Sequence, residues 1–473
     1  MELDKDLQAR QQARDFARQA QQAQKILAQM PQQKLDAIVK AVADAFAGAS
    51  GELAELAVRE TGFGNVTDKM TKNEFASKKV LSAIEKMTCV GVLKENPSEK
   101  LWEIGVPVGV IAAIVPSTNP TSTVCYKAMI ALKSGNSIVF SPHPKAIACT
   151  LRAANIVAQA AESAGAPKGS VSCLAIPSMA GCKELMEAEE TRLILATGGP
   201  AMVKAAYSSG KPAIGVGAGN GPVYIHHSAD TRQALECILQ SKTFDYGTVC
   251  ASEQSIIVEA SMEQEVREIA TKMGFYFMDK AEAGCLAKLL FKPNGTLNPE
   301  IVGKSATALA EKAGFSVPSS TRVLVAREQE AGPTRPYSME KLCPVLAFFV
   351  MDSEDAVLQK AIEVLIHEGS GHTFAMHAQD RAVIEKFALQ IPVSRFLVNT
   401  PAALGGIGAT TGLFPALTLG CGAVGGSSSS NNISPMDLIN IRRVAWGKES
   451  SPKPSVDENL LDILTAKILE RLK

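Results

Sequence analysis

Apolar residues in the first part of the chain recur at helical spacing. Residues 4–30 are rich in Gln, Ala and Arg, and their apolar positions repeat as on one side of a helix. Pro31 interrupts this pattern, and Lys34–Phe46 and Glu52–Glu60 resume it. A single apolar stripe on each segment predicts surface helices that pack on a larger body.

From about residue 105 short, nearly all-apolar runs alternate with Ala-rich helical patterns. The predicted strands are Val108–Val115, Ser137–Phe140, Val171–Ile176 and Leu193–Ala196, and the predicted helices are Thr121–Leu132, Ile147–Ala164, Met179–Met186 and Pro200–Ser208. Strands that are apolar throughout favour a parallel sheet covered on both faces. The pattern therefore predicts a doubly wound α/β domain, a frequent site for nucleotide cofactors.

The alternation of strands and helices restarts after residue 255. The predicted strands are Ile256–Val258, Val323–Val325, Val345–Val350 and Phe396–Asn399, and the predicted helices are Met262–Met273, Ala306–Ala313, Asp355–Ile366 and Asp380–Gln390. This pattern indicates a second α/β lobe. Two such lobes favour a functional site in the cleft between them.

The end of the chain carries a separate helical pattern. Ser455 and Glu458, just after a Pro-Lys-Pro breaker, have the spacing of a capping box. The apolar residues that follow mark one helix face: Val456, Leu460, Leu461, Ile463, Leu464, Ile468, Leu469 and Leu472. Two interpretations stay open, a helix that packs on its own chain or a neighbouring subunit, and a detachable targeting or docking helix.

Composition excludes several classes of protein. The chain has 473 residues, is 46% hydrophobic, and balances 48 Lys and Arg against 48 Asp and Glu. This neutral balance argues against a nucleic-acid partner, and no apolar run approaches the ~20 residues of a membrane-spanning helix. Ten cysteines without a C-x-x-C pair or a signal peptide predict free thiols, a cytoplasmic location and no metal site.

Cys250 is the cysteine best placed for chemistry. It lies in the polar, Gly-containing stretch Thr243–Ser255, immediately before a predicted buried strand. A thiol on such a turn can act as a nucleophile if the site lowers its pKa or supplies a base. The alternative is an ordinary small core residue, which we predict for the cysteines in Ala-rich helices or apolar strands: Cys125, Cys149, Cys173, Cys182 and Cys237.

Polar or glycine-rich segments follow three predicted strands of the first lobe. They are Val115–Ser122, Ser141–Lys145 and Thr197–Pro200. In a doubly wound sheet, loops of this kind form the ligand crevice, and a Thr-Gly-Gly turn at a helix start can bind a pyrophosphate. None matches the G-x-G-x-x-G fingerprint, and each alone could be only a turn. Their occurrence after successive strands favours a dinucleotide site.

Six segments together carry a family resemblance. They are Ile114–Pro120, Phe140–Pro144, Ala196–Pro200, Gly215–Asn220, Thr243–Ser255 and Leu417–Gly422. The chain resembles the aldehyde dehydrogenase superfamily in its CoA-acylating branch, and is similar to the aldehyde-oxidising half of bifunctional aldehyde–alcohol dehydrogenases. The motifs run in family order through residues 10–447. The resemblance implies an aldehyde dehydrogenase-like fold with two doubly wound α/β lobes and a small β oligomerisation arm.

The resemblance also implies a division of the chain into domains. Residues 1–89 and 105–243 would form the dinucleotide-binding domain, and residues 244–430 the catalytic domain with the nucleophilic cysteine. Residues 90–104 and 431–447 would form the oligomerisation arm of a homodimer or a dimer of dimers. Residues 448–473 would be a linker and the C-terminal helix.

Individual roles follow from the matched motifs. Cys250 would be the nucleophile, and Asn119 would donate its amide N–H to the oxyanion together with the Cys250 main-chain N–H. Glu340 would contact the nicotinamide ribose. The other residues expected at the cofactor are Pro116, Ser117, Thr118, Ser141, His143, Thr197, Gly198, Gly199 and Gly217.

Two positions indicate how the acyl group leaves. Hydrolytic members of the family carry a glutamate base at about the place of Gly217, and glycine cannot deprotonate water. The resemblance therefore implies release by a thiol, with CoA as co-substrate. His372 matches a histidine of the acylating branch, and we expect it to be either the base for that thiol or a hydrogen-bonded core histidine.

The resemblance implies the reaction aldehyde + CoA + NAD+ to acyl-CoA + NADH on a short-chain aldehyde such as acetaldehyde. NADP stays open, because Ser141 and His143 occupy the loop where hydrolytic relatives carry a lysine. Three alternatives also stay open: an acylating sulfoacetaldehyde dehydrogenase, a hydrolytic aldehyde dehydrogenase, and a cargo enzyme of a bacterial microcompartment whose C-terminal helix is a docking signal.

Overall fold

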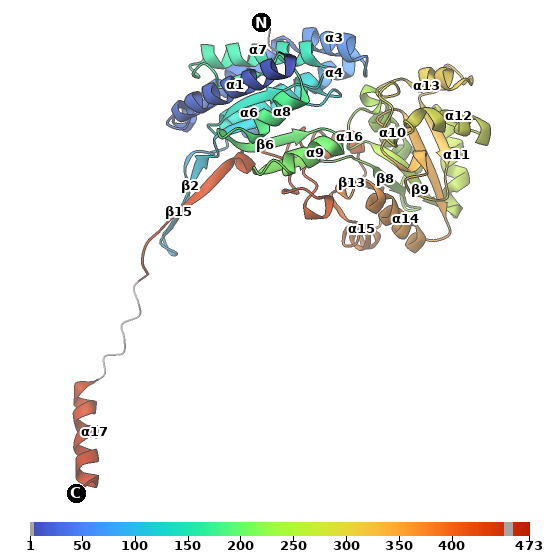
Figure 1. The fold of residues 1–473 in the computed structure, drawn as a ribbon. Helices are drawn as coiled ribbons and strands as arrows, with labels where there is room; N and C mark the ends of the chain where they lie inside the picture. The colour runs from blue at the N-terminus through green and yellow to red at the C-terminus, as the bar shows by residue number, and fades with distance from the viewer. Residues whose placement is uncertain (1–3, 449–456) are drawn as a thin grey trace.

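The computed structural model describes residues 4–448 and 457–473. Two parallel sheets and one antiparallel sheet organise this part of the chain (Figure 1). The strand orders are β5-β4-β3-β6-β7, β10-β11-β12-β9-β8-β13-β14 and β1-β2-β15. The prediction of two α/β lobes with a small additional sheet is confirmed.

The five-stranded sheet forms the first lobe. Its strands are β3 (Val110–Ile114), β4 (Ser137–Ser141), β5 (Val171–Cys173), β6 (Thr191–Thr197) and β7 (Ala213–Val216), and the helices between them are α6 (Pro120–Lys133), α7 (Ile147–Ser163), α8 (Met179–Glu187) and α9 (Pro200–Tyr207). The third strand ends earlier than predicted. The Gln12 side chain accepts hydrogen bonds from the N–H groups of Ala175 and Ile176 and takes the place of a strand partner.

Six helical segments precede the small sheet. They are α1 (Lys5–Leu27), α2 (Gln32–Gly48), α3 (Ser50–Thr61), α4 (Val66–Glu74), the π-helical turn η1 (Phe75–Lys79) and α5 (Val80–Ile84). Alternate residues of β3 show how these helices cover both faces of the sheet. Val110 packs in one core cluster with Ala13 of α1, whereas Ile111 packs in another with Leu35 of α2. The predicted amphipathic helices are present.

The seven-stranded sheet forms the second lobe. Its strands are β8 (Gly221–Ile225), β9 (Glu253–Glu259), β10 (Phe275–Phe277), β11 (Val323–Arg327), β12 (Val345–Met351), β13 (Gly371–His377) and β14 (Val393–Val398). Its helices are α10 (Thr231–Thr243), α11 (Glu263–Lys272), α12 (Lys280–Leu290), α13 (Ala306–Ala313), α14 (Glu354–His367), α15 (Arg381–Ala388) and α16 (Ala402–Gly406).

The chain passes from one sheet to the other earlier than the expected domain boundary near residue 243. Strand β8 pairs with β9 and β13, so residues 217–220 connect the two large sheets. The reason is that β8 finds its hydrogen-bond partners among strands of the second lobe. The domain ranges themselves stay a prediction.

The small sheet joins distant segments. It consists of β1 (Gly91–Asn96), β2 (Leu101–Pro107) and β15 (Ile439–Ala445), all antiparallel. Figure 1 shows β2 and β15 extending away from the first lobe. The segments are those expected to form an arm, and their part in assembly stays a prediction.

Helix α17 (Glu458–Arg471) lies near the end of the chain and apart from both lobes in Figure 1. The Asp457 side chain caps it by accepting from the N–H of Asn459. The expected cap, Ser455, lies outside the described residues, as does Val456. In the part of the chain that the structure describes, no helix combines the length and the apolar character needed to cross a membrane.

Candidate active site

The carboxyl ends of four strands meet at one edge of the first lobe. Ile114 of β3 lies opposite Ser141 and Ala196, and Thr197 of β6 lies opposite Val216. Because these strands are parallel, the segments that leave them start side by side. The structure thus places the loops that begin with Pro116, Ser141 and Gly198 at a common edge, as the sequence pattern predicted, and adds the segment that begins with Gly217.

The middle of this edge is open. A side chain built at Gly199 or Gly217 would meet no atom within 4 Å. The Thr197 hydroxyl is buried and has no hydrogen-bond partner among the described residues. Gly199 is the N-cap of α9, whose first residue, Pro200, has no N–H, so it is chiefly the positive end of the helix that favours an anion here. These residues fit the pyrophosphate of a nicotinamide dinucleotide, and their individual contacts stay predictions.

The second loop at this edge has a buried start and an exposed tip. Ser141 is buried and its carbonyl accepts from the N–H of Val115 at 3.1 Å. His143 is exposed, and its Nδ1 accepts from the N–H of Lys145 at 3.1 Å. The imidazole is therefore held at the tip of the loop.

Cys250 lies where the two lobes meet. It is half-buried and stands two residues after Thr248, just before β9. A Cβ atom built at Gly219 would lie 1.9 Å from the Cys250 carbonyl oxygen and 3.1 Å from Cε1 of His372. Only glycine permits this approach. The structure therefore brings the segment after β7, the cysteine and His372 together.

The electrostatic environment keeps the Cys250 thiol protonated. Burial raises the pKa of Cys250 to about 12, and the nearby Glu340 carboxylate adds to the increase. Arg395 opposes it. The nucleophile consequently needs a base, or a further positive charge supplied on ligand binding, before it can react.

Glu340 links two segments of the site. Its Oε1 accepts a 2.8 Å hydrogen bond from the N–H of Gly219, and its own N–H donates to Glu368 Oε2 at 2.7 Å. Burial, followed by the charge of Glu368, raises the pKa of Glu340 to about 7. The expected ribose-contacting residue therefore lies beside the cysteine, and its contact with the cofactor stays a prediction.

Asn119 stands at the N-cap of α6, yet its side chain does not cap that helix. Its Oδ1 accepts from Lys72 Nζ at 2.6 Å. Its Nδ2 donates to Thr118 Oγ1 at 3.2 Å and to the Thr248 carbonyl at 3.5 Å. The amide nitrogen of Asn119 is thus directed at the loop that carries Cys250.

The sequence analysis missed a buried charge cluster behind Asn119. Asp245 Oδ2 accepts from Lys72 Nζ at 2.5 Å and from Lys69 Nζ at 2.9 Å. All three side chains are almost completely buried. A carboxylate in a buried motif requires a cation, so Asp245 within Thr243–Ser255 was the signal available.

The loop that holds Asp245 is strained. Asp245 and Tyr246 both adopt left-handed backbone conformations, with φ of 48° and 51°. This conformation costs roughly 1–2 kcal/mol per residue. The ion pairs of Asp245 hold this backbone conformation. Gly64 leaves room for it, because a Cβ atom at position 64 would lie 1.7 Å from Asp245 Oδ1. The loop leading to the cysteine is therefore set by contacts with the N-terminal helices.

Arg395 on β14 was also missed. It is buried, and its Nη2 donates to the Gly420 carbonyl at 2.7 Å. The Arg395 charge acts on three site groups, since it opposes the pKa increase of Cys250 and Cys421 and lowers the pKa of His372. No pattern in the sequence distinguished this arginine, because it lies in an ordinary strand.

His372 is completely buried on β13. Its Nδ1 lies 2.9 Å from Thr373 Oγ1, and in the described residues its Nε2 has no hydrogen-bond partner. Burial, with Arg395 second, lowers the pKa of His372 to about 3, so the imidazole is neutral. A neutral ring with a free nitrogen suits a proton acceptor and equally a core histidine, so both interpretations remain.

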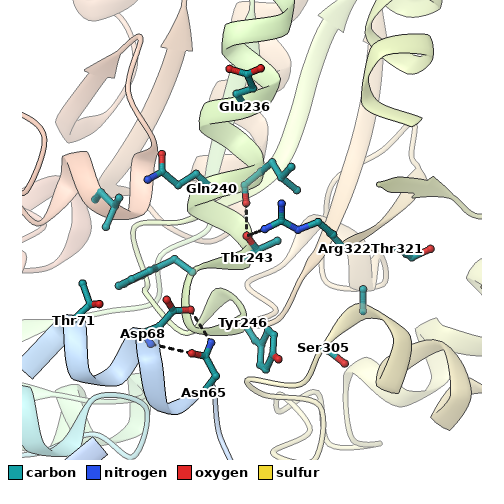
Figure 2. A pocket seen from close by; sticks show the side chains of 14 residues that line it. Asn65, Asp68, Thr71, Glu236, Gln240, Thr243, Tyr246, Ser305, Thr321 and Arg322 are labelled. Atoms are coloured by element: carbon teal, nitrogen blue, oxygen red, sulfur yellow. Dashed lines mark hydrogen bonds between the residues drawn. The ribbon is translucent and has the colours of Figure 1, made fainter. Parts of the chain in front are cut away.

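A cavity of about 820 Å³ adjoins the cysteine loop (Figure 2). Its lining residues include Asp68 and Thr71 of α4, Gln240 of α10 and Phe244. Asp68 Oδ2 accepts from the main-chain N–H of Asp245 at 2.7 Å, so the cavity wall is continuous with the charge cluster. None of the residues expected at the active site lines this cavity.

The remaining thiols behave largely as predicted. All ten cysteines are free, and Cys125, Cys149, Cys173 and Cys182 are buried, whereas Cys237 is half-buried. Among the described residues, one group of potential metal ligands has atoms within 4.8 Å of one another. It consists of His226, His227 and Glu259, at the opposite ends of β8 and β9 from Cys250. The expectation of no metal stays a prediction.

Two α/β lobes with a cysteine loop between them, and open glycine turns at the edge of one sheet, fit an enzyme that binds a nicotinamide dinucleotide. The chain belongs to the aldehyde dehydrogenase family, whose pattern matches residues 6–274, more than half of the chain. The suspected family is thereby confirmed.

Curated relatives and solved structures agree with this assignment. The chain is 46% identical over 434 residues to the bifunctional aldehyde-alcohol dehydrogenase AdhE of Escherichia coli K12, which covers 90% of this chain and 48% of that protein. It thus spans about half the length of the bifunctional relatives. An acetylating aldehyde dehydrogenase from Geobacillus thermoglucosidasius superposes with a TM-score of 0.93 at 49% identity, over 95% of this chain and 99% of the other. A propionaldehyde dehydrogenase from the fucose utilisation bacterial microcompartment of Clostridium phytofermentans superposes at 0.84 with 28% identity, over 92% and 98%.

Proposed function

We propose that this chain is a CoA-acylating aldehyde dehydrogenase, which converts an aldehyde, CoA and NAD+ reversibly to acyl-CoA and NADH. The observation that carries this proposal is Gly217. It stands at about the position of the glutamate base of hydrolytic relatives, in a segment that packs against Cys250 through Gly219. The names of the acetylating and propionaldehyde-oxidising relatives support it.

The first half of the mechanism forms a thioester on Cys250. The Cys250 sulfur adds to the aldehyde carbon after its proton is removed. The resulting oxyanion accepts hydrogen bonds from Asn119 Nδ2 and the Cys250 N–H, and one such donor contributes ~3 kcal/mol. A bound nicotinamide supplies the hydride acceptor. Loss of the hydride as the carbonyl re-forms leaves the acyl group on Cys250.

The second half transfers the acyl group to CoA. The CoA sulfur attacks the thioester carbonyl, its proton passes to His372 Nε2, and the Cys250 thiolate leaves as acyl-CoA forms. His372 is neutral and its Nε2 is free to accept a proton, but its pKa of about 3 makes it a weak base, so this role requires that the bound ligands raise the pKa. A free acid is not the product, because the segment Gly215–Asn220 contains no acidic side chain to activate water.

A short aliphatic aldehyde such as acetaldehyde is the proposed substrate, with sulfoacetaldehyde as the second choice. NAD is the proposed cofactor on the strength of the family resemblance. NADP is the alternative, since a similar structure, an engineered glycolyl-CoA reductase, holds NADP+ at 29% identity and a TM-score of 0.84. Initial rates with a panel of aldehydes and with each cofactor decide both points.

The function is tested by NADH formation and product analysis with and without CoA. We expect CoA-dependent NADH formation and an acyl-CoA product identified by mass spectrometry. Cys250→Ala should abolish both, whereas Cys285→Ala, at an exposed thiol, should retain them. Equal NADH formation without CoA, or acyl-CoA formation by the Cys250→Ala protein at the normal rate, would contradict the proposal.

The three-stranded arm is proposed to hold a homodimer or a dimer of dimers. The rings of Trp102 and Trp446 in this arm pack edge to face with 5.1 Å between their centroids, and both side chains are exposed. Exposed aromatic residues beside open strand edges are typical of an interface. Light scattering should show the oligomer for the native chain and a smaller species for Trp446→Glu. An unchanged oligomer in that variant would rule out the arm.

A second proposed role is docking in a bacterial microcompartment through α17. Its apolar residues, Leu460 to Leu472, are 50–78% exposed, and every described side chain of the helix is exposed. The microcompartment origin of one similar enzyme supports this role. Removal of residues 452–473 should leave the kinetics intact and abolish co-assembly with shell proteins, and Lys467→Gln should preserve co-assembly. Unfolding of the truncated enzyme, or its normal co-assembly, would contradict docking.

A further inference from the structure

The ammonium group of Lys72 is completely enclosed by acceptors. Its Nζ donates to Asn119 Oδ1 at 2.6 Å, to Asp245 Oδ2 at 2.5 Å and to Thr248 Oγ1 at 2.9 Å. A lysine ammonium has three protons, so each proton has one partner. The side chain is only 3% exposed. A lysine at the surface seldom has three such partners. The arrangement therefore holds Lys72 Nζ in one position behind Asn119.

Asn119 departs from the usual behaviour of its position. Asparagine at a helix N-cap normally accepts a hydrogen bond from the first turn, and Asn119 at the start of α6 makes no such bond. Its oxygen faces Lys72 instead. Since an ammonium can only donate, the end of the carboxamide next to Lys72 must be oxygen. The NH2 end is thereby turned to the Thr248 carbonyl, two residues before Cys250.

We propose that Lys72 is a positioning residue for the reaction, whose charge orients the Asn119 carboxamide and polarises its N–H toward the oxyanion formed at Cys250. This inference rests on the proposed function, in which Asn119 is the oxyanion donor. A cation on the amide oxygen withdraws electron density from the nitrogen, so the N–H becomes a stronger donor where negative charge develops.

Asp245 maintains the charge of Lys72. Burial lowers the pKa of Lys72 to about 8, with Asp245 and Asp68 opposing the decrease and Lys69 adding to it. These are the charged groups that face Lys72 from α4 and from the loop before Cys250. As pH rises through about 8, Lys72 loses its proton and polarises Asn119 less. An alkaline decline in kcat follows.

Two variants on the same helix separate this role from a structural one. Lys72→Met removes the charge and leaves an unbranched side chain that is one atom shorter. Lys69→Met is the matched control, because Lys69 also pairs with Asp245 but donates to the Thr118 carbonyl and not to Asn119. We expect Lys72→Met to lower kcat roughly tenfold or more, as for a weakened oxyanion donor, with KM for the aldehyde little changed. Lys69→Met should lower kcat at pH 7 clearly less than Lys72→Met does.

The pH dependence of kcat separates the proposed role of Lys72 from a packing role, because packing alone would not produce it. The alkaline decline should disappear in Lys72→Met, move to higher pH in Lys69→Met, and move to lower pH in Asp245→Asn, because Lys69 lowers and Asp245 raises the pKa of Lys72. If Lys72→Met does not fold, the two opposite shifts still decide the question. A wild-type kcat and profile in Lys72→Met, or no shift in the other two, would overturn the inference.

Failure of this inference is distinguishable from failure of the proposed function. If the native enzyme forms no acyl-CoA from any aldehyde, the proposed function fails. If the native enzyme is active and Cys250→Ala is not, but Lys72→Met matches the native kcat, only the role of Lys72 is wrong.

Discussion

The main-chain N–H of Gly219 donates a 2.8 Å hydrogen bond to Oε1 of Glu340. The same glycine lies so close to the Cys250 carbonyl that a Cβ atom would be 1.9 Å from it. One residue of the segment that connects the two large sheets therefore contacts both the cysteine loop and the glutamate expected at the cofactor. Substitutions in residues 217–220 should therefore alter the catalytic activity, although the segment is short.

Gly219→Ala should impair the enzyme much more than Gly217→Ala. The alanine methyl at position 219 would collide with main-chain atoms of Cys250, which cannot move without displacing the nucleophile. At position 217 the added methyl would meet no atom within 4 Å. We expect at least a roughly tenfold loss of CoA-dependent activity for Gly219→Ala. Steady-state kinetics and melting temperatures of the two variants provide the check, and equal activity would show that the contact is not limiting.

Gly217→Glu should divert the acyl group to water. A Cβ atom at this position would meet no atom within 4 Å and the φ is not positive, so the backbone tolerates a side chain, and a glutamate carboxylate would restore the base that hydrolytic relatives carry. We expect NADH formation without CoA and a free acid among the products. Gly217→Gln is the control, because it has the same size without a basic group. If neither variant yields acid, Gly217 is not at the position of the base.

His372→Gln should separate the two half-reactions if His372 serves the incoming thiol. Thioester formation would continue, so mixing enzyme with aldehyde and cofactor should give one rapid burst of NADH followed by slow turnover with CoA. Stopped-flow absorbance measures both phases, with Cys250→Ala as the variant without a burst. A proportional loss of burst and turnover would favour the core-histidine interpretation.

Glu253→Gln should change the pH dependence of stability. Glu253 is buried, its Oε1 accepts from the Ala402 N–H at 3.0 Å, and its Oε2 has no partner within the described chain. Burial raises the pKa of Glu253 to about 7. A carboxyl with a raised folded-state pKa contributes stability below its unfolded pKa, and this is lost as pH rises through about 7, by on the order of 3 kcal/mol.

The measurement for Glu253 is the melting temperature at several pH values between 5 and 8. The native protein should lose more of its melting temperature over this range than Glu253→Gln, because glutamine does not ionise. Glu236→Gln, at an exposed position, should follow the native protein. Parallel curves for the native protein and Glu253→Gln would show that the pKa of Glu253 is not raised in the folded protein.

Local sequence was sufficient for most of the elements and for the choice of candidate site residues. Apolar runs such as Val110–Ile114 could be recognised as strands, because a strand that is buried on both faces is apolar throughout. Cys250 and the loops after β3, β4 and β6 were likewise identified, since motif residues adjoin strand ends and strand ends share an edge. The strands β7, β8, β10 and β13 were not predicted, and His372 lies on the last of them.

Tertiary structure alone decided which charges support those residues. Lys72 and Asp245 are 173 positions apart, and Arg395 acts on the pKa of Cys250 from the distant strand β14. Periodicity reports which residues are buried and whether an element is a helix or a strand, but not which buried cation meets which buried anion. That pairing depends on how α4 packs on the cysteine loop. The sequence by itself determined the family and singled out the cysteine expected to be the nucleophile, whereas the fold decided how Asn119 is held, because a buried charge is stable only where a distant segment supplies its counter-ion.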